Sequence, residues 1–349
     1  MATPTATLAN ATTLANFVFD EAAFKARSPY PLIATNLKGA YATPAPPDTF
    51  DPKTASQSDL MKNGLMWRKP APGDPPSVQA AWDKFFSRKW LAQDRIVPES
   101  HPQVGVTHNY RGAAPKKQAD STYTGTVWSG AGTKTGKWTS IIGYWKIPTV
   151  SEPSEPQGSE GGWNSSSWVG LDGFFYSNDV LQAGVQQRVL LIPPFNLALP
   201  VYVAWYEWFA PPQASSPGYI YQTNIGNFAV SPGDQVYCSV QYNGTASGSI
   251  SFANENTGKH FSITLAPPPG ASFNGQSCEW ILEAPDGGEP ISSLPKFTPV
   301  TFTSALACGP GNAVANPQSG DILNIESAGG RILTKTTVGT DTCTIGFIG

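Results

Sequence analysis

The chain has 349 residues, and only 13% of them are Asp, Glu, Lys or Arg, well below the roughly 25% of ordinary soluble proteins. Its formal net charge of -3 comes without a basic stripe that would meet a phosphate backbone, which argues against a nucleic-acid partner. The 34 glycines and 33 prolines favour many short strands and turns, so we expect an all-β protein.

Charge divides the chain at about residue 120. Residues 1–120 hold 14 Lys and Arg against 10 Asp and Glu, and residues 121–349 hold 8 against 15, which gives net charges of +4 and -7. A protein with so few basic residues gains little positive charge when its carboxylates are protonated, which suits an acidic working environment. Unselected drift in composition is the alternative explanation.

The N-terminal third reads differently from the rest. Residues 41–76 are rich in proline and predict extended or irregular structure. Residues 77–96 predict the best helix in the chain, with a weaker one near 14–26. The helical spacing in 77–96 is carried by Val78, Trp82, Phe85, Phe86, Lys89 and Trp90. Residues 108–121 are polar and basic, and we expect a linker or a cleavage region there.

From about residue 122 onwards, short β-rich runs alternate with Gly, Pro, Asn and Asp. This pattern predicts a two-sheet antiparallel β-sandwich of jelly-roll or concanavalin type, preceded by an N-terminal extension of mixed helix and irregular structure. The runs are 136–148, 165–173, 200–209, 234–243, 248–256, 260–268, 277–285, 297–305 and 331–338.

Targeting and cross-linking signals are weak. The first residues lack a basic region followed by a continuous apolar one, so there is no clear signal peptide. The longest apolar stretch, 189–205, is interrupted by prolines, so we expect no membrane span. The cysteines allow two disulfides in three pairings and show no metal-ligand spacing, and we expect neither metal nor cofactor. They are Cys238, Cys278, Cys308 and Cys343.

Alternation along the strands predicts which side chains share a face. Trp168, Gly170 and Asp172 lie on one side of their run, and Gln182 lies opposite Leu181 and Ala183. The other two runs contribute, on one side each, Val203, Trp205 and Glu207, and Glu279, Ile281 and Glu283. If these faces line one sheet, they form a tryptophan-walled cleft that contains an amide and several carboxylates.

The chemistry open to such a cleft is carboxylate chemistry. The three histidines, at 101, 108 and 260, lie outside the strands that form the cleft, so a Ser-His-Asp arrangement has no evident base, and no HExxH motif is present. A glycosidase would use two acids, for which Glu207 and Glu283 are candidates. A peptidase would use one acid and a hydrogen-bond donor for the oxyanion.

Four motifs in order resemble those of the glutamic peptidases, the eqolisin family of acid peptidases. They are "WVGLDG", "LQAG", "AWYEW" and "EWILE", and the resemblance extends from about Trp128 in "VWSGAG" to the C-terminus. It implies a β-sandwich with a catalytic glutamine and glutamate on its concave face. By motif these are Gln182 and Glu283, the last residue of "EWILE".

The resemblance also implies roles for these two residues. Gln182 would donate a hydrogen bond to the developing oxyanion and help to hold the attacking water, and Glu283 would take a proton from that water and pass it to the leaving amine. A glutamate with an ordinary pKa near 4.3 serves as a base in acid, where a histidine would be protonated. The alternative for Gln182 is a solvent-facing strand residue without a catalytic role.

Supporting residues have two interpretations each. Trp128, Trp168 and Trp205 match aromatic residues at the family's cleft, although any sandwich core needs tryptophans. Glu207 either orients the catalytic pair or is simply a buried, hydrogen-bonded carboxylate. Asp172 is expected to support the site from behind the catalytic pair, although "DG" is also an ordinary turn signal.

The functional prediction is therefore an acid endopeptidase, without a cofactor, that acts on polypeptides. We expect a monomer in an extracellular or acidic compartment, by resemblance. The alternative is a carbohydrate-active or carbohydrate-binding sandwich that uses Glu207 and Glu283. Residues 122–349 are expected to form the peptidase domain. Residues 1–121 are interpreted as a removable propeptide or as a permanent extension packed through Trp82, Phe85, Phe86 and Trp90, and the resemblance favours the propeptide.

Overall fold

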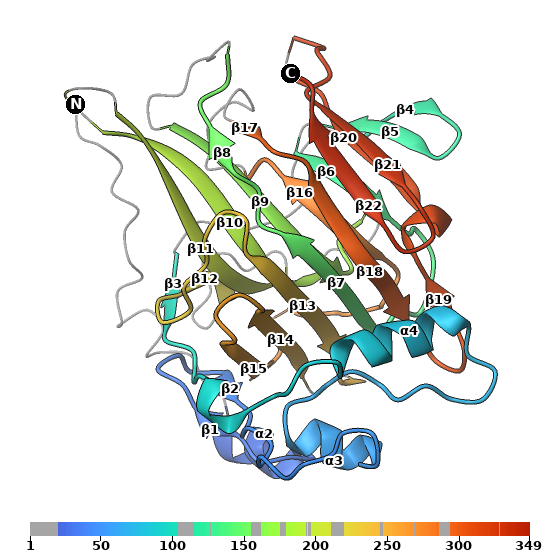
Figure 1. Cartoon of the computed structure of the whole chain (residues 1–349). Coiled ribbons are helices and arrows are strands. Elements are labelled where there is room, and N and C mark those ends of the chain that lie inside the picture. The colour runs from blue at the N-terminus through green and yellow to red at the C-terminus, as the bar shows by residue number, and fades with distance from the viewer. Residues whose placement is uncertain are drawn as a thin grey trace.

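Two large sheets face each other and form the body of the molecule (Figure 1). The computed structural model describes residues 20–103, 115–125, 127–154, 162–174, 179–192, 194, 197–210, 220–244, 247–268, 270–285, 294–327 and 329–349. The expected β-sandwich is confirmed. The pairing of strands is antiparallel throughout both large sheets, except that β20 runs parallel to β5.

The first sheet has the strand order β1-β2-β15-β14-β13-β7-β18-β22-β21, with β19 beside β18. Its strands are β1 Ile33–Ala34, β2 Ala40–Ala42, β15 His260–Leu265, β14 Gly248–Asn254, β13 Gln235–Tyr242, β7 Ser140–Lys146, β18 Val300–Cys308, β22 Cys343–Phe347, β21 Thr334–Val338 and β19 Val314–Ala315. A separate pair is formed by β8 Val150–Ser151 and β17 Lys296–Phe297.

The second sheet has the order β3-β12-β11-β10-β9-β16-β6-β20-β5-β4. Its strands are β3 Ser100–Pro102, β12 Ile220–Ile225, β11 Leu197–Phe209, β10 Val180–Ile192, β9 Gly162–Leu171, β16 Cys278–Glu283, β6 Trp128–Gly132, β20 Asp321–Ile325, β5 Thr122–Gly125 and β4 Lys116–Ala119. A short 3-10 helix, η4, spans Pro317–Ser319.

The main core lies between the two sheets. Leu181 and Val185 of β10 and Val169 of β9 pack in one buried cluster with Val240 and Phe252 of the first sheet. Two indole groups also cross the interface: Trp145 Nε1 donates to Ser167 Oγ at 3.0 Å, and Trp280 Nε1 donates to the carbonyl of Ile142 at 2.9 Å. Alternate residues of each strand therefore fill this core, and the others point away from it.

The N-terminal extension joins both sheets and covers the outer face of the first. It contributes β1 and β2 to the edge of the first sheet and β3 to the edge of the second. Helix α4, Pro76–Phe85, lies across β18 and its neighbours (Figure 1). The remaining helices are α2 Glu21–Arg27, α3 Gln57–Lys62 and the 3-10 helix η1 Ala92–Asp94.

Aromatic side chains anchor this extension. We call their contact with the outer face of the first sheet the aromatic seam. It consists of Leu60, Leu65, Trp67, Val78, Ala81, Trp82, Phe85, Phe86 and Trp90 packed against Ile142, Tyr144, Tyr237, Ala253, Leu306 and Cys308. The four residues named from the sequence as possible packing residues of the extension all belong to it. The helices of the extension are therefore anchored on the first sheet, while β3 and β4 belong to the second.

Helix α4 is shorter than the sequence pattern predicts. The expected helix of 77–96 ends at Phe85, with Phe86 as its C-cap. Trp90 folds back and donates its indole N–H to the carbonyl of Phe85 at 3.1 Å, so a side chain satisfies an acceptor that a continuing helix would have bonded. The weaker helix expected near 14–26 begins only at Glu21 within the described residues, and 14–19 lie outside them.

All four cysteines lie in the described part of the chain, and each is a buried free thiol. Burial raises the pKa of every one of them above its ordinary value. Neutral thiols of this kind behave as small apolar residues, and Cys238, Cys278 and Cys343 belong to the main core. Two disulfides were possible on the cysteine count alone, and the fold uses these residues for packing.

Candidate active site

The outer face of the second sheet carries the amide and the carboxyl groups, and we call it the carboxyl face. Gln182 on β10 pairs with Glu207 on β11 on one side and with Gly170 on β9 on the other. Gly170 pairs in turn with Glu279 on β16. Glu207, Gln182, Gly170 and Glu279 therefore form one row across four neighbouring strands, and all three side chains are fully buried.

The next row along the strands is aromatic. Trp205 on β11 pairs with Gly184, which pairs with Trp168, which pairs with Ile281. A Cβ at Gly184 would lie 2.5 Å from Cβ of Trp168, closer than atoms pack. The glycine is therefore required for the indole of Trp168 to lie beside β10.

The third row holds the carboxyl group of Glu283. Ser166 on β9 pairs with Gln186 on one side and with Glu283 on the other, and Glu283 pairs with Trp128 on β6. Trp205 Nε1 reaches across the rows and donates to Ser166 Oγ at 2.8 Å, and that hydroxyl donates to the carbonyl of Val185 at 3.2 Å. The motif search from sequence did not find this serine.

Two hydrogen bonds fix the polar groups named from the sequence. Gln182 Nε2 donates to Glu207 Oε2 at 3.1 Å, and Trp168 Nε1 donates to Glu283 Oε2 at 2.9 Å. Glu283 is 1% exposed and Gln182 is 0% exposed, so neither is a solvent-facing strand residue. Glu207 is in direct contact with Gln182, which agrees with an orienting role.

The indole of Trp168 links the two halves of this arrangement. Its nitrogen holds Glu283, while its Cζ3 lies 2.8 Å from the place that a Cβ on Gly170 would occupy. Cβ of Gln182 lies 3.3 Å from the same place. One ring therefore extends from Glu283 to the side of Gln182, and the strand that bears it separates β10 from β16.

Trp128 completes the apolar wall. It packs edge-on against Trp168 with ring centroids 4.9 Å apart and stacks on Phe174 at 6.4 Å. With Trp205 and Ile281 these side chains belong to one buried cluster on the carboxyl face, separate from the main core. Such a wall lowers the local dielectric constant around the carboxyl groups and strengthens their electrostatic interactions.

Asp172 supports the strand that carries both glutamates of "EWILE". It follows β9 with a φ of 67°, an uncommon conformation for a residue other than glycine. Its carboxylate accepts the backbone N–H groups of Asn274 at 2.8 Å, Gly275 at 2.9 Å and Gln276 at 2.7 Å. It therefore holds the loop that leads into β16. Strand alternation places Asp172 on the same side as Trp168, but its side chain turns to this loop instead.

Glu279 is the site residue that the motif comparison passed over. Burial raises its pKa well above the ordinary value, the Asp172 carboxylate raises it further, and the Ser277 hydroxyl opposes this. Strand parity had placed it on the same face as Glu283. Only the strand register shows that Glu279 and Gln182 lie in one row, on either side of Gly170.

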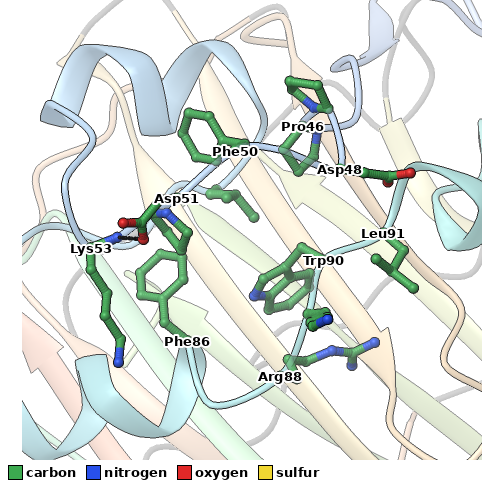
Figure 2. A pocket seen from close by; sticks show the side chains of 13 residues that line it. Pro46, Asp48, Phe50, Asp51, Lys53, Phe86, Arg88, Trp90 and Leu91 are labelled. Atoms are coloured by element: carbon green, nitrogen blue, oxygen red, sulfur yellow. Dashed lines mark hydrogen bonds between the residues drawn. The ribbon is translucent and has the colours of Figure 1, made fainter.

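The described residues hold no group of three or more His, Cys, Asp or Glu side chains that suits a metal ion. A cavity of about 210 Å³ lies on the other side of the molecule, within the N-terminal extension (Figure 2). Phe50, Phe86 and Trp90 line it, and it shares no residue with the carboxyl face. Among the described helices, none has the length and apolarity needed to cross a bilayer.

Known proteins resemble the part of the chain in which the sequence motifs lie. The sequence model of the Peptidase A4 family matches residues 126–347, which is more than half of the chain. The chain belongs to the Peptidase A4 family. Within this family, aspergillopepsin-2 of Aspergillus niger is 28% identical over 234 residues, which cover 63% of this chain and 77% of that protein.

Solved structures agree on the fold of this family member. Scytalido-glutamic peptidase with a transition state analog inhibitor matches with a TM-score of 0.51 at 19% identity, over 64% of this chain and 98% of the other. The same peptidase with a peptide based transition state analog gives 0.50 at 20% identity, again over 64% and 98%. The resemblance to glutamic peptidases is confirmed, and the chain is a glutamic endopeptidase, a hydrolase of peptide bonds.

Proposed function

We propose that the chain is an acid endopeptidase in which Gln182 and Glu283 act together on one water molecule. The observation that carries the proposal is the position of Trp168, whose indole binds Glu283 through its nitrogen and lies beside Gln182 with its opposite edge. The two polar groups thus share one buried face and one rigid support. Such support is what a preorganised site requires.

Gln182 supplies the electrostatic part of the mechanism. A side-chain amide carries two N–H groups, and one of them is donated to Glu207 Oε2. This bond fixes which end of the amide is nitrogen, and the second N–H then donates to the scissile carbonyl oxygen. A donor of this kind stabilises the oxyanion of the tetrahedral intermediate and typically contributes about 10²- to 10³-fold in turnover.

Glu283 handles the proton. As a carboxylate it takes one proton from the attacking water while the water oxygen bonds to the scissile carbonyl carbon. As a neutral acid it then gives that proton to the amine nitrogen as the C–N bond breaks, so the group returns to its starting state. The indole N–H of Trp168 holds one oxygen of this carboxyl group throughout.

The carbohydrate alternative fits the geometry less well. Glu207 and Glu283 lie on β11 and β16, which are separated by β10 and β9, and they stand in the first and the third row of the carboxyl face. Glycosidases hold their two carboxyl groups about 5 to 9.5 Å apart. Glu207 is also engaged by Gln182, which suits an orienting group.

The test is a comparison of substrates. Purified protein is incubated at pH 3 to 6 with casein and with a panel of polysaccharides, beside a Glu283→Gln preparation that controls for contaminating enzymes. We expect peptides from casein with wild-type protein only and no sugar release from either preparation. Sugar release that depends on both Glu207 and Glu283, without casein cleavage, would replace the peptidase proposal with the carbohydrate one.

We further propose that residues 20–103 stay bound to the peptidase unit in the working enzyme. Trp67 and Phe85 are each 1% exposed within the aromatic seam, and removing the extension would uncover Tyr144 and Tyr237 of the first sheet. A large apolar patch of this kind is unfavourable in water. Sequence considerations favour a removable propeptide instead, so the two proposals compete.

Acid incubation separates these proposals. The full chain is kept at about pH 4, and new N-termini and the composition of the gel-filtration peak are determined. We expect any cut in the linker at 108–121, of which 108–114 lie outside the described residues, to leave 20–103 in the same peak as the peptidase unit. Recovery of an active enzyme that lacks 20–103 would establish a removable propeptide.

The working environment that we propose is an acidic extracellular space or compartment, and the working form a monomer. The low content of basic residues and the buried carboxyl groups support the first proposal. Gel filtration at pH 4 and pH 7 tests the second, with a single peak at about the mass of one chain expected at both values.

A further inference from the structure

Glu279 lies where it can act on Gln182. It is fully buried on the carboxyl face, in the same row as the amide, and Gly170 is the one residue between them in that row. The edge of the Trp168 ring also lies over Gly170, with Cζ3 2.8 Å from the place that a Cβ on this glycine would take. The place that a Cβ on Gly170 would take is 3.2 Å from Glu279 Oε1 and 3.3 Å from Cβ of Gln182. The missing side chain of the glycine thus leaves the Glu279 carboxyl group on the same side of β9 as the base of the Gln182 side chain.

The surroundings of Glu279 favour its neutral form. Neither of its oxygens has a partner at hydrogen-bond distance among the described residues, and the nearby Ser277 hydroxyl opposes the effect of burial on its pKa without cancelling it. The ionisable groups that surround it are acids or a thiol: Asp172, Glu207 in the same row, Glu283 on the same strand, Asp321 beyond Gly132 and the Cys278 thiol on the core side. The nearest cation along this row, Lys134, is bound to Asp321 at 2.8 Å. Burial without a neighbouring cation favours the protonated form of a carboxyl group.

We propose that Glu279 is a positioning residue which, in its neutral form, presents its O–H to the amide oxygen of Gln182 across Gly170 and thereby keeps the amide nitrogen turned toward Glu207. This inference rests on the proposed function, because it assigns Glu279 a task through Gln182. Glu207 accepts from one end of the amide, and Glu279 donates to the other. The two acids thus define the amide orientation from opposite sides.

The loss of the Glu279 proton reverses this arrangement. An ionised Glu279 only accepts hydrogen bonds, so it competes with Glu207 for the N–H groups of Gln182 and favours the flipped amide. It also adds a negative charge beside the place where the oxyanion forms. Turnover therefore falls as Glu279 ionises, while substrate binding changes little. Glu279 sets the alkaline limit of activity, and the higher its pKa lies, the further toward neutral pH the enzyme works.

The experiment measures kcat and KM from pH 2 to 8 for wild type, Glu279→Gln and Glu279→Leu, after unfolding curves confirm that each is folded. Glutamine donates an N–H and does not ionise. Glu279→Gln should keep kcat within about 3-fold of wild type at pH 4. The alkaline limb, the fall of kcat at high pH, should move up by at least about one pH unit. Leucine has no donor, so at pH values below the alkaline limit of wild type kcat should fall about 10-fold or more with KM nearly constant. Asp321→Asn, the next acid along the row, is the matched control and should leave the limb in place.

Two results would overturn the inference. Complete loss of activity in Glu279→Gln at every pH would make Glu279 itself the proton carrier, and a profile identical to wild type in both variants would make it a packing residue. If Glu279→Gln does not fold, Glu279→Asp is measured instead. This variant keeps a titrating acid but holds it farther from Gln182, so kcat should be lower and should still fall at alkaline pH. A wild-type kcat in Glu279→Asp would overturn the proposal. Glu283→Gln in the same assay isolates the proposed function, which fails on its own if that variant is active.

Discussion

The carboxyl face and the aromatic seam both bury ionisable groups, but the groups are of opposite kinds. The carboxyl face encloses Glu207, Glu279 and Glu283, whereas beside the aromatic seam the extension and the first sheet enclose His260 and the half-buried Arg95. Burial favours the neutral form of Glu279, which needs no partner charge, whereas acid adds a positive charge to the buried His260. A fall in pH should therefore leave Glu279 unchanged and strain the attachment of the extension.

Hydrogen bonds and a ring contact hold His260 and Arg95 in place. His260 opens β15 and donates from Nε2 to the carbonyl of Leu91 at 3.1 Å, and its ring meets Trp90 edge-on at 5.0 Å. Arg95 donates to the carbonyl of Asn63 at 2.8 Å. Burial, followed by the charge of Arg95, lowers the pKa of His260 to about 3, and burial lowers the pKa of Arg95 to about 9.

The largest expected effect concerns the aromatic seam. Phe85 is 1% exposed, and its ring lies 4.9 Å from that of Tyr237 and 4.5 Å from that of Trp90. Phe85→Ala should lower the free energy of unfolding by about 3–5 kcal/mol through lost burial and a cavity, with little change in kcat because the seam is remote from the carboxyl face. Denaturant unfolding at pH 5 measures this, with exposed Gln79→Ala on the same helix as control. Equal stabilities of the two variants would mean that the extension is not an integral part of the fold.

The second prediction concerns His260. Its folded-state pKa of about 3 lies below the roughly 6.5 of an unfolded chain, so between these values the unfolded chain binds a proton that the folded one does not. Stability is therefore lost as the pH falls from 6.5 to 3, by up to about 5 kcal/mol. His260→Gln should remove most of this slope, and His101→Gln, which removes an exposed imidazole, should not. An unchanged slope would show that the seam is not the acid-sensitive region.

A smaller effect of opposite sign is expected at Asp179, three residues before Gln182. Burial raises its pKa to about 6, against the hydrogen bond from the Ser272 backbone N–H. The folded chain then holds a proton that the unfolded chain loses, so stability falls as the pH rises from about 4 to 6, by up to about 3 kcal/mol. Asp179→Asn should flatten thermal stability across that window. A steeper decline in the variant would contradict the assignment.

Sequence reasoning found the fold because the signal was local. The nine β-rich runs correspond to strands β7, β9, β11, β13, β14, β15, β16, β18 and β21, since alternation and turn residues mark each strand without reference to its neighbours. It did not identify β12, β20 or β22 in advance, and it extended α4 past Phe85. There a fold-back by Trp90 ends the helix, and that contact depends on tertiary structure.

For the site, strand parity placed Gln182, Glu207, Glu279 and Glu283 on one side of their strands before their partners were known. What parity could not give is the register. Pairing of Gln182 with Gly170, and of Gly170 with Glu279, is a property of three strands distant in sequence. The contact of Asp172 with the 274–277 loop is likewise a long-range bond, which a turn signal in "DG" does not reveal.

The most direct test of the proposed dyad is the pH dependence of kcat/KM for a peptide substrate, measured from pH 2 to 7 in Gln182→Ala, Gln182→Glu, Glu283→Gln and Glu207→Gln after each variant is shown to be folded. We predict background activity for Glu283→Gln and a loss of about 10²- to 10³-fold for Gln182→Ala. Gln182→Glu should be weaker and shifted to lower pH, because the new carboxyl group donates only when protonated, and Glu207→Gln should be impaired but active. Near wild-type activity in Gln182→Ala together with complete loss in Glu207→Gln would contradict the dyad and assign the chemistry to a pair of carboxylates.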